Sequence, residues 1–157
     1  MTGLRAARRL ALLIPAALLG GAYLGQYAFG LYPCEMCWWQ RWPHFAALAL
    51  ALLSFTVKGA AIRPVLLLAG LAILISGLIG GFHSGVEYGW WEGVTSCSST
   101  IEAAGGDYLD AIMNAPIVRC DQVQWSLFGI SLAGYNFLIS VAGATVIFVM
   151  ASRRTAG

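Results

Sequence analysis

The chain has 157 residues, of which 59% are hydrophobic and only 10% are charged, and its mean hydropathy is +0.75. A soluble domain of this length carries far more charge on its surface, so the composition excludes that class and favours an integral membrane protein. The net charge of +2 gives no indication of nucleic-acid binding.

Four apolar runs are long enough to cross about 30 Å of hydrocarbon. They cover residues 10–30, 38–57, 64–82 and 126–151. The first run resembles a secretory signal peptide, but it continues well beyond the small residues at 20–22, and we interpret it as an uncleaved span. Gly77 and Gly81 in the third run are interpreted as a close helix-packing site. The sequence therefore predicts one all-α membrane domain over residues 1–157, an antiparallel bundle of four transmembrane helices.

Charge is distributed unequally between the two sides of this predicted bundle. Seven of the nine Lys and Arg residues flank the runs on one side, and all seven acidic residues fall on the other. The seven basic residues are Arg5, Arg8, Arg9, Lys58, Arg63, Arg153 and Arg154. The basic side is cytoplasmic by the positive-inside rule. Both termini are then inside, and the loops at about 31–37 and 84–125 are outside.

The long outer loop at 84–125 holds Cys97 and Cys120. Residues 99–102 have the form of a capping box, and Asp107 can cap a second short helix that Pro116 ends. Apolar side chains would line one side of that helix. The pattern predicts a short amphipathic helix lying on the membrane surface, which would hold the loop and its cysteines close to the bilayer.

The short outer loop carries a Cys-x-x-Cys pair, Cys34 and Cys37, directly after Pro33. Such a pair closes only a small ring, so its usual use is redox exchange or metal binding. Arg41 follows Cys37 by four residues, so in a helix the two share a face. A fixed cation and the positive helix N-terminus would both favour a thiolate at Cys37.

The two histidines of the chain are candidate cofactor contacts. His44 lies seven residues after Cys37, on roughly the same helical stripe. His83 is near the outer end of the third run, at the membrane depth of Arg41. The simpler interpretation of each is an interfacial polar group.

The four cysteines form an even set on the outer, oxidising side. Two purely structural disulfides would add little stability to a four-span bundle. A disulfide between Cys34 and Cys37 closes so short a loop that it hardly lowers the entropy of the unfolded chain. We therefore favour a redox function. A zinc site is the alternative, although Cys97 and Cys120 lack the close spacing of a second metal-binding pair.

With these features the chain resembles a known family, disulfide bond formation protein B (DsbB), the quinone-linked membrane thiol oxidases of the bacterial envelope. The resemblance covers nearly the whole chain: four spans, both termini inside and one cysteine pair in each outer loop. The positions that carry it are Pro33, Cys34, Cys37 and Arg41, and Cys120 followed by Trp125 and Gly129.

The resemblance implies resting disulfides Cys34–Cys37 and Cys97–Cys120. Cys97 would be the sulfur attacked by a periplasmic thioredoxin-like dithiol protein resembling DsbA. Cys120 would then exchange with Cys34, leaving Cys37 as a thiolate.

The resemblance also implies a membrane quinone, ubiquinone or menaquinone, as the cofactor beside Cys37. Arg41 would stabilise the thiolate and the reduced quinone, and His44 and His83 are the further candidates for the quinone site. No metal ligand is assigned. The expected location is the bacterial inner membrane, in contact with lipid and the quinone pool.

Two alternatives belong to different classes. One is an enzyme similar to vitamin K epoxide reductase, which also couples a Cys-x-x-Cys pair to a quinone but carries a different loop arrangement. The other is a non-enzymatic haem- or metal-binding membrane bundle. A haem protein would explain His44 and His83, but not the cysteines.

Overall fold

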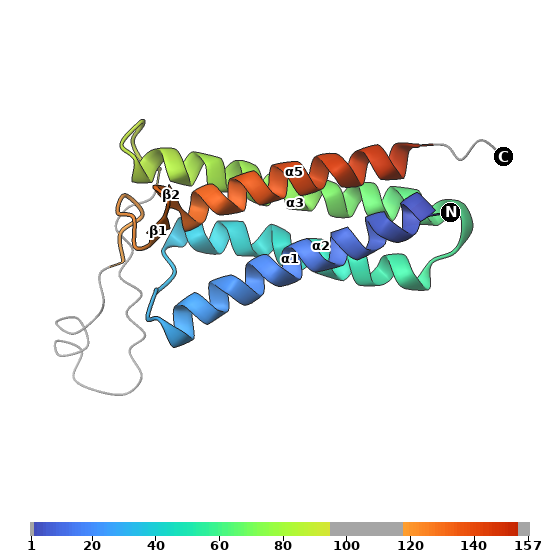
Figure 1. Cartoon of the computed structure of the whole chain (residues 1–157), viewed down its shortest axis with the longest axis horizontal. Helices are drawn as coiled ribbons and strands as arrows, with labels where there is room; N and C mark the ends of the chain where they lie inside the picture. The colour runs from blue at the N-terminus through green and yellow to red at the C-terminus, as the bar shows by residue number, and fades with distance from the viewer. Residues whose placement is uncertain (1, 95–117, 154–157) are drawn as a thin grey trace.

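The computed structural model describes residues 2–94 and 118–153. Its long elements within these ranges are the helices α1 (Thr2–Ala28), α2 (Glu35–Thr56), α3 (Ile62–Glu87) and α5 (Leu132–Ser152). The short elements of these ranges are a 3-10 turn (Gly59–Ala61) and two antiparallel strands, β1 (Ser126–Leu127) and β2 (Ile130–Ser131). Figure 1 shows the four helices side by side, with the chain reversing direction from each to the next.

Three stretches of the described residues are long and apolar enough to cross a membrane: Gly3–Ala28, Gly59–Glu87 and Leu132–Ser152. Helix α2 is long enough but is not among them. Its N-terminal half carries Gln40, Arg41 and His44, whose polarity lowers the average hydropathy. The chain is thus a mostly helical, multi-pass membrane protein, and the crossing by α2 stays a prediction.

The predicted fourth span, 126–151, is wrong at its start, because the helix begins only at Leu132. The preceding residues form the β1–β2 hairpin, with Phe128 at φ 51° and Gly129 at φ 77°. This left-handed turn suits glycine and cannot continue into a helix. Ser131 then caps α5, since its Oγ accepts a hydrogen bond from Gly134 N at 3.2 Å.

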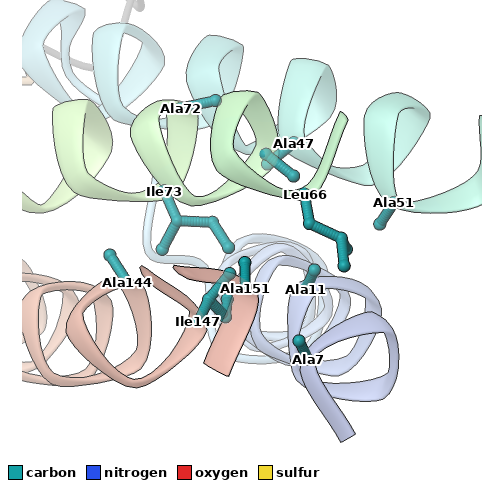
Figure 2. Packing of buried hydrophobic residues seen from close by; sticks show 11 residues of the cluster. Ala7, Ala11, Ala47, Ala51, Leu66, Ala72, Ile73, Ala144, Ile147 and Ala151 are labelled. Carbon is teal, nitrogen blue, oxygen red and sulfur yellow. The ribbon is translucent and has the colours of Figure 1, made fainter. Parts of the chain in front are cut away.

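Small side chains fill the core at the end of the bundle that carries the chain termini (Figure 2). The buried cluster consists of Ala7, Ala11, Ala47, Ala51, Leu66, Ala69, Ala72, Ile73, Ala144, Ile147 and Ala151. Such residues let helix backbones approach closely inside a bilayer. A Cβ on Gly77 would lie 2.8 Å from Ser140 Cβ, and one on Gly81 would lie 2.8 Å from Phe137 Cδ2. The packing interpretation of Gly77 and Gly81 is therefore confirmed.

A second buried cluster lies at the opposite end of the bundle. It joins Cys34, Met36, Val86, Val118 and Cys120, from the α1–α2 loop, α2, the end of α3 and the segment before β1. Packing of this segment brings Cys120 onto the ends of two helices. Cys97 and the predicted amphipathic helix lie outside the described residues.

Candidate functional site

The Cys-x-x-Cys pair forms the first turn of α2. Cys34 is the N-cap residue, and its Sγ accepts a hydrogen bond from Cys37 N at 3.3 Å. The helix then begins at Glu35, so Cys37 lies within the first turn, where unpaired backbone N–H groups create a positive end. Cys34 is 2% exposed and Cys37 is half-buried.

The two sulfurs of this pair have different roles in their hydrogen bond. Cys34 Sγ donates to Cys37 Sγ across 3.0 Å. This bond to Cys37, together with burial, raises the pKa of the Cys34 thiol above its ordinary value. Cys34 therefore keeps its proton, and Cys37 is the sulfur whose charged form receives a hydrogen bond.

Cys34 is also close to groups from two other parts of the chain. Its Sγ, a ring nitrogen of His83 and the Sγ of Cys120 all lie within 4.8 Å of one another. All three residues are buried. Cys34 Sγ is thus close to both other cysteine sulfurs of the described residues, 3.0 Å from Cys37 Sγ and within 4.8 Å of Cys120 Sγ.

Arg41 is buried against α1, with 6% of its surface exposed. Its Nη1 donates to Gln26 Oε1 at 2.7 Å, and its Nη2 lies 3.4 Å from Ala22 O. The guanidinium carbon is 4.8 Å from the ring centroid of Tyr23 and 4.9 Å from that of Trp38. The guanidinium of Arg41 is therefore held inside the bundle by α1 and by two aromatic rings.

A cavity of about 240 Å³ lies between α1 and the ends of α2, α3 and α5 that are near the cysteines. The four residues predicted for the cofactor site, Cys37, Arg41, His44 and His83, all line it. Its remaining wall includes small and apolar side chains of α1, namely Ala17, Leu18, Leu19, Gly21, Ala22 and Gly25. The predicted residues thus come together, although their roles stay predictions.

Sequence reasoning missed the two amides that organise this cavity, Gln40 and Asn136. Gln40 Nε2 donates to Met36 O at 3.0 Å and lies 2.9 Å from His83 Nδ1. Asn136 Nδ2 donates to Gln40 Oε1 at 2.8 Å, and Asn136 Oδ1 lies 2.9 Å from His44 Nε2. The sequence did contain a signal for Asn136, which is a lone amide in the apolar run 132–152. A polar side chain within a membrane span is energetically costly, so it usually has a function or forms a hydrogen bond to another helix.

Glu87 was missed as well. It is the last residue of α3, and its side chain lines the cavity with 8% of its surface exposed. Glu87 Oε1 lies 3.9 Å from His83 Nε2, and Glu87 Oε2 has no hydrogen-bond partner among the described residues. The third apolar run was predicted to end at residue 82, which left Glu87 in the loop instead of on the helix.

Fold and site together define a multi-pass membrane protein with a Cys-x-x-Cys pair at the start of a helix, a third cysteine close to Cys34, and a largely apolar cavity that both cysteines of the pair line. A family model described as disulfide bond formation protein DsbB matches residues 4–150. The chain belongs to the DsbB family.

Several curated relatives are proteins named disulfide bond formation protein B. The chain is 31% identical to the one from a Polaromonas species, over 88% of this chain and 84% of the relative. It is 30% identical to the one from Paracidovorax citrulli, over 94% and 89%. It is 27% identical to disulfide bond formation protein B 1 of Pseudomonas aeruginosa, over 85% of each. No solved structure matches the chain.

Proposed function

We propose that the protein is a thiol:quinone oxidoreductase of the bacterial inner membrane. It reoxidises a periplasmic, thioredoxin-like dithiol protein similar to DsbA and passes the electrons to a membrane quinone. The observation that carries this proposal is the single cavity that Cys34, Cys37 and Arg41 line together. Family membership supports the same reaction class.

The proposed electron path runs through two disulfides, Cys97–Cys120 and Cys34–Cys37. A thiolate of the partner attacks Cys97, and resolution of the mixed disulfide oxidises the partner and reduces Cys97 and Cys120. The Cys120 thiolate attacks Cys34, which breaks the Cys34–Cys37 bond and releases Cys37 as a thiolate. The proximity of Cys34 to Cys120, within 4.8 Å, supports this exchange.

The last disulfide is regenerated at the cavity. Cys97 attacks Cys120 in the Cys34–Cys120 disulfide, which restores Cys97–Cys120 and releases Cys34 as a thiol. Closure of Cys34 on Cys37 then forms the second disulfide and gives up two electrons and two protons. A quinone bound beside Cys37 would take up those two electrons and two protons. Arg41 supports the thiolate and a quinone oxygen, because its buried charge faces the same cavity.

The cavity fits the ring of a quinone. Its volume of about 240 Å³ is below the range of about 300–1,000 Å³ that encloses a drug-sized ligand. A single ring therefore suits it, with the long apolar tail lying outside in the lipid. The α1 wall is apolar, and the polar groups converge at α2 and α3, which is the pattern of a site that orients a ring through a few polar atoms.

We propose four spans in one membrane domain, with both termini cytoplasmic and both cysteine loops periplasmic. Basic residues support this orientation, because Arg63 at the start of α3 and Arg153 after α5 meet at the end of the bundle opposite the cysteines, where Arg63 donates to Arg153 O. Labelling of reduced cells with a membrane-impermeant thiol reagent tests the orientation. Labelling that requires opening of the inner membrane would contradict it.

A zinc site is the second candidate, because Cys34, His83 and Cys120 offer two sulfurs and one nitrogen within 4.8 Å. This ligand set requires reduced cysteines, whereas the proposed resting state holds them as disulfides. Metal analysis of the purified protein, with and without reductant, separates the two functions.

The test of the proposed function is quinone reduction by the purified protein with a reduced thioredoxin-like partner. We expect partner-dependent quinone reduction that is lost in Cys37→Ser. If the protein does not reduce quinone, a Soret band would indicate a haem protein and stoichiometric zinc would indicate the zinc site.

A further inference from the structure

The two histidines of the cavity differ in how their ring nitrogens are satisfied. Gln40 Nε2 is fixed as a nitrogen because it donates to the backbone carbonyl of Met36. The same nitrogen lies 2.9 Å from His83 Nδ1, which must therefore accept. Neutral His83 then carries its proton on Nε2, which lies 3.6 Å from Cys34 Sγ and 3.9 Å from Glu87 Oε1. Both nitrogens of His83 thus face protein groups of the dithiol site.

His44 has only one nitrogen engaged in this way. Asn136 Nδ2 is fixed by its bond to the backbone carbonyl of Ser76 at 3.1 Å, so Asn136 Oδ1 is the atom 2.9 Å from His44 Nε2. Ser140 Oγ also donates to this oxygen at 2.9 Å. His44 Nε2 therefore carries the proton, and His44 Nδ1 is left as a lone-pair acceptor.

His44 Nδ1 is buried and has no hydrogen-bond partner among the described residues. The residue is 3% exposed, and it lines the cavity. A buried acceptor without a donor is unfavourable, so a ligand that brings a donor to it gains affinity. His44 lies three positions after Arg41 along α2, so a donor group and an acceptor group face the cavity about one helical turn apart.

We propose that His44 is the histidine that contacts the cofactor, and that its Nδ1 accepts a hydrogen bond from a hydroxyl of the reduced quinone. Asn136 is the positioning residue, because it holds His44 in the tautomer that presents this acceptor. This inference rests on the proposed function. It assigns His83 to the dithiol, where it contacts Cys34, and not to the quinone.

The chemistry of the two quinone forms makes this contact selective. An oxidised quinone offers only carbonyl acceptors, which match Arg41 but not the lone pair of His44. The reduced form offers hydroxyl donors, which match His44. His44 thus favours the reduced form. A tenfold preference would raise the midpoint potential of the bound quinone by about 30 mV, which favours electron flow away from the cysteines.

Nitrogen NMR of the protein labelled with 15N-histidine tests the tautomer directly. The chain has two histidines, so the spectrum of His44→Gln assigns both. We expect His44 to be protonated on Nε2 without ligand, and its Nδ1 signal to move when a short-chain hydroquinone is added. In Asn136→Leu the fixed tautomer should be lost. A His44 protonated on Nδ1 in the ligand-free protein would overturn the inference.

Two substitutions distinguish a direct contact between His44 and the quinone from a role of His44 in packing. His44→Gln keeps a polar group that reaches Asn136 but removes the acceptor at the δ position, whereas His44→Asn keeps a polar atom there. Loss of one ordinary hydrogen bond corresponds to roughly threefold to tenfold in affinity. We expect His44→Gln to weaken hydroquinone binding by that factor and oxidised quinone binding by less than about twofold. His44→Asn should restore part of the loss.

His83→Gln is the comparison variant for the dithiol, where it should alter alkylation of Cys34. Arg8→Lys, at the opposite end of the bundle, is the matched control that should leave both quinone affinities unchanged. Tryptophan fluorescence reports binding independently of turnover. The inference is wrong, while the proposed function stands, if both quinone forms bind but hydroquinone moves only the NMR signals of His83. It is equally wrong if His44→Gln weakens the binding of both forms by the same factor. If neither form binds, the proposed function fails, and this assignment fails with it.

Discussion

Replacing Arg41 with Lys should weaken quinone binding while leaving the bundle folded. A guanidinium has five N–H donors in a fixed fork, and α1 engages two of its nitrogens through Gln26 and Ala22. The remaining donors are available to the cavity. An ammonium has three donors on a flexible stem, so Lys cannot hold α1 and a quinone oxygen with the same geometry.

The expected magnitude follows from the bonds at stake. A hydrogen bond to a charged group contributes about 1.5–3 kcal/mol, so loss of one such bond raises the dissociation constant roughly tenfold to a hundredfold. Arg41→Lys should fall at the lower end, because it retains the charge. Arg41→Ala should exceed it, because it also removes the stacking on Tyr23 and Trp38, which is worth about 0.5–2 kcal/mol.

Quinone titration of purified variants, followed by tryptophan fluorescence, measures this effect. Arg8→Lys is the matched control, since Arg8 donates to Val57 O at 3.2 Å and stacks on Phe55 at the opposite end of the bundle. It should leave quinone affinity unchanged. If Arg41→Lys, Arg41→Ala and Arg8→Lys all bind quinone as the parent does, Arg41 only anchors α1 and our assignment of its role is refuted.

Three further predictions concern the cysteines and the packing of the helices. Cys120→Ser should trap the partner on Cys97 as a mixed disulfide, visible on a non-reducing gel, because the resolving thiol is gone. In the fully reduced protein at neutral pH, iodoacetamide should modify Cys37 before Cys34, because hydrogen bonding to Cys37 and burial raise the pKa of the Cys34 thiol. Gly77→Ala should destabilise the bundle by about 1–3 kcal/mol in a detergent unfolding titration, because the added Cβ meets α5.

Each of these predictions has its own contradicting result. A mixed disulfide on Cys34 in the Cys120→Ser variant would reverse the assigned order of electron flow. Mass spectrometry that finds Cys34 alkylated first would contradict the direction of the thiol hydrogen bond. The control for Gly77→Ala is Gly20→Ala, where nothing lies within 4 Å and the better helix propensity should give up to about 1 kcal/mol of stabilisation. Equal stability of the two variants would contradict the packing argument.

Spacing along single helices made much of the site predictable. Cys37, Arg41 and His44 share one face of α2 because residues three, four and seven apart coincide on a helix, and all three line the cavity. His83 was predictable from its depth in the third run. These inferences needed only local geometry, which the sequence encodes directly.

The remaining features depend on contacts between distant segments. Nothing near Asn136 in the sequence indicates that it meets Gln40 and His44, since the helices must first pack. Hydropathy alone does not distinguish a short hairpin from the start of a span, so the segment before Leu132 was assigned to the helix. A glycine after Phe128 was the available turn signal.

Transfer of electrons from the dithiol to a quinone is the central claim, and a single-turnover experiment tests it most directly. The fully reduced protein is mixed without oxygen or partner with a short-chain quinone, and quinone absorbance and remaining thiols are measured together. We predict that two thiols disappear for each quinone reduced, and that Cys37→Ser abolishes both changes. Quinone that stays oxidised, with every thiol of the folded protein still present, would contradict the account.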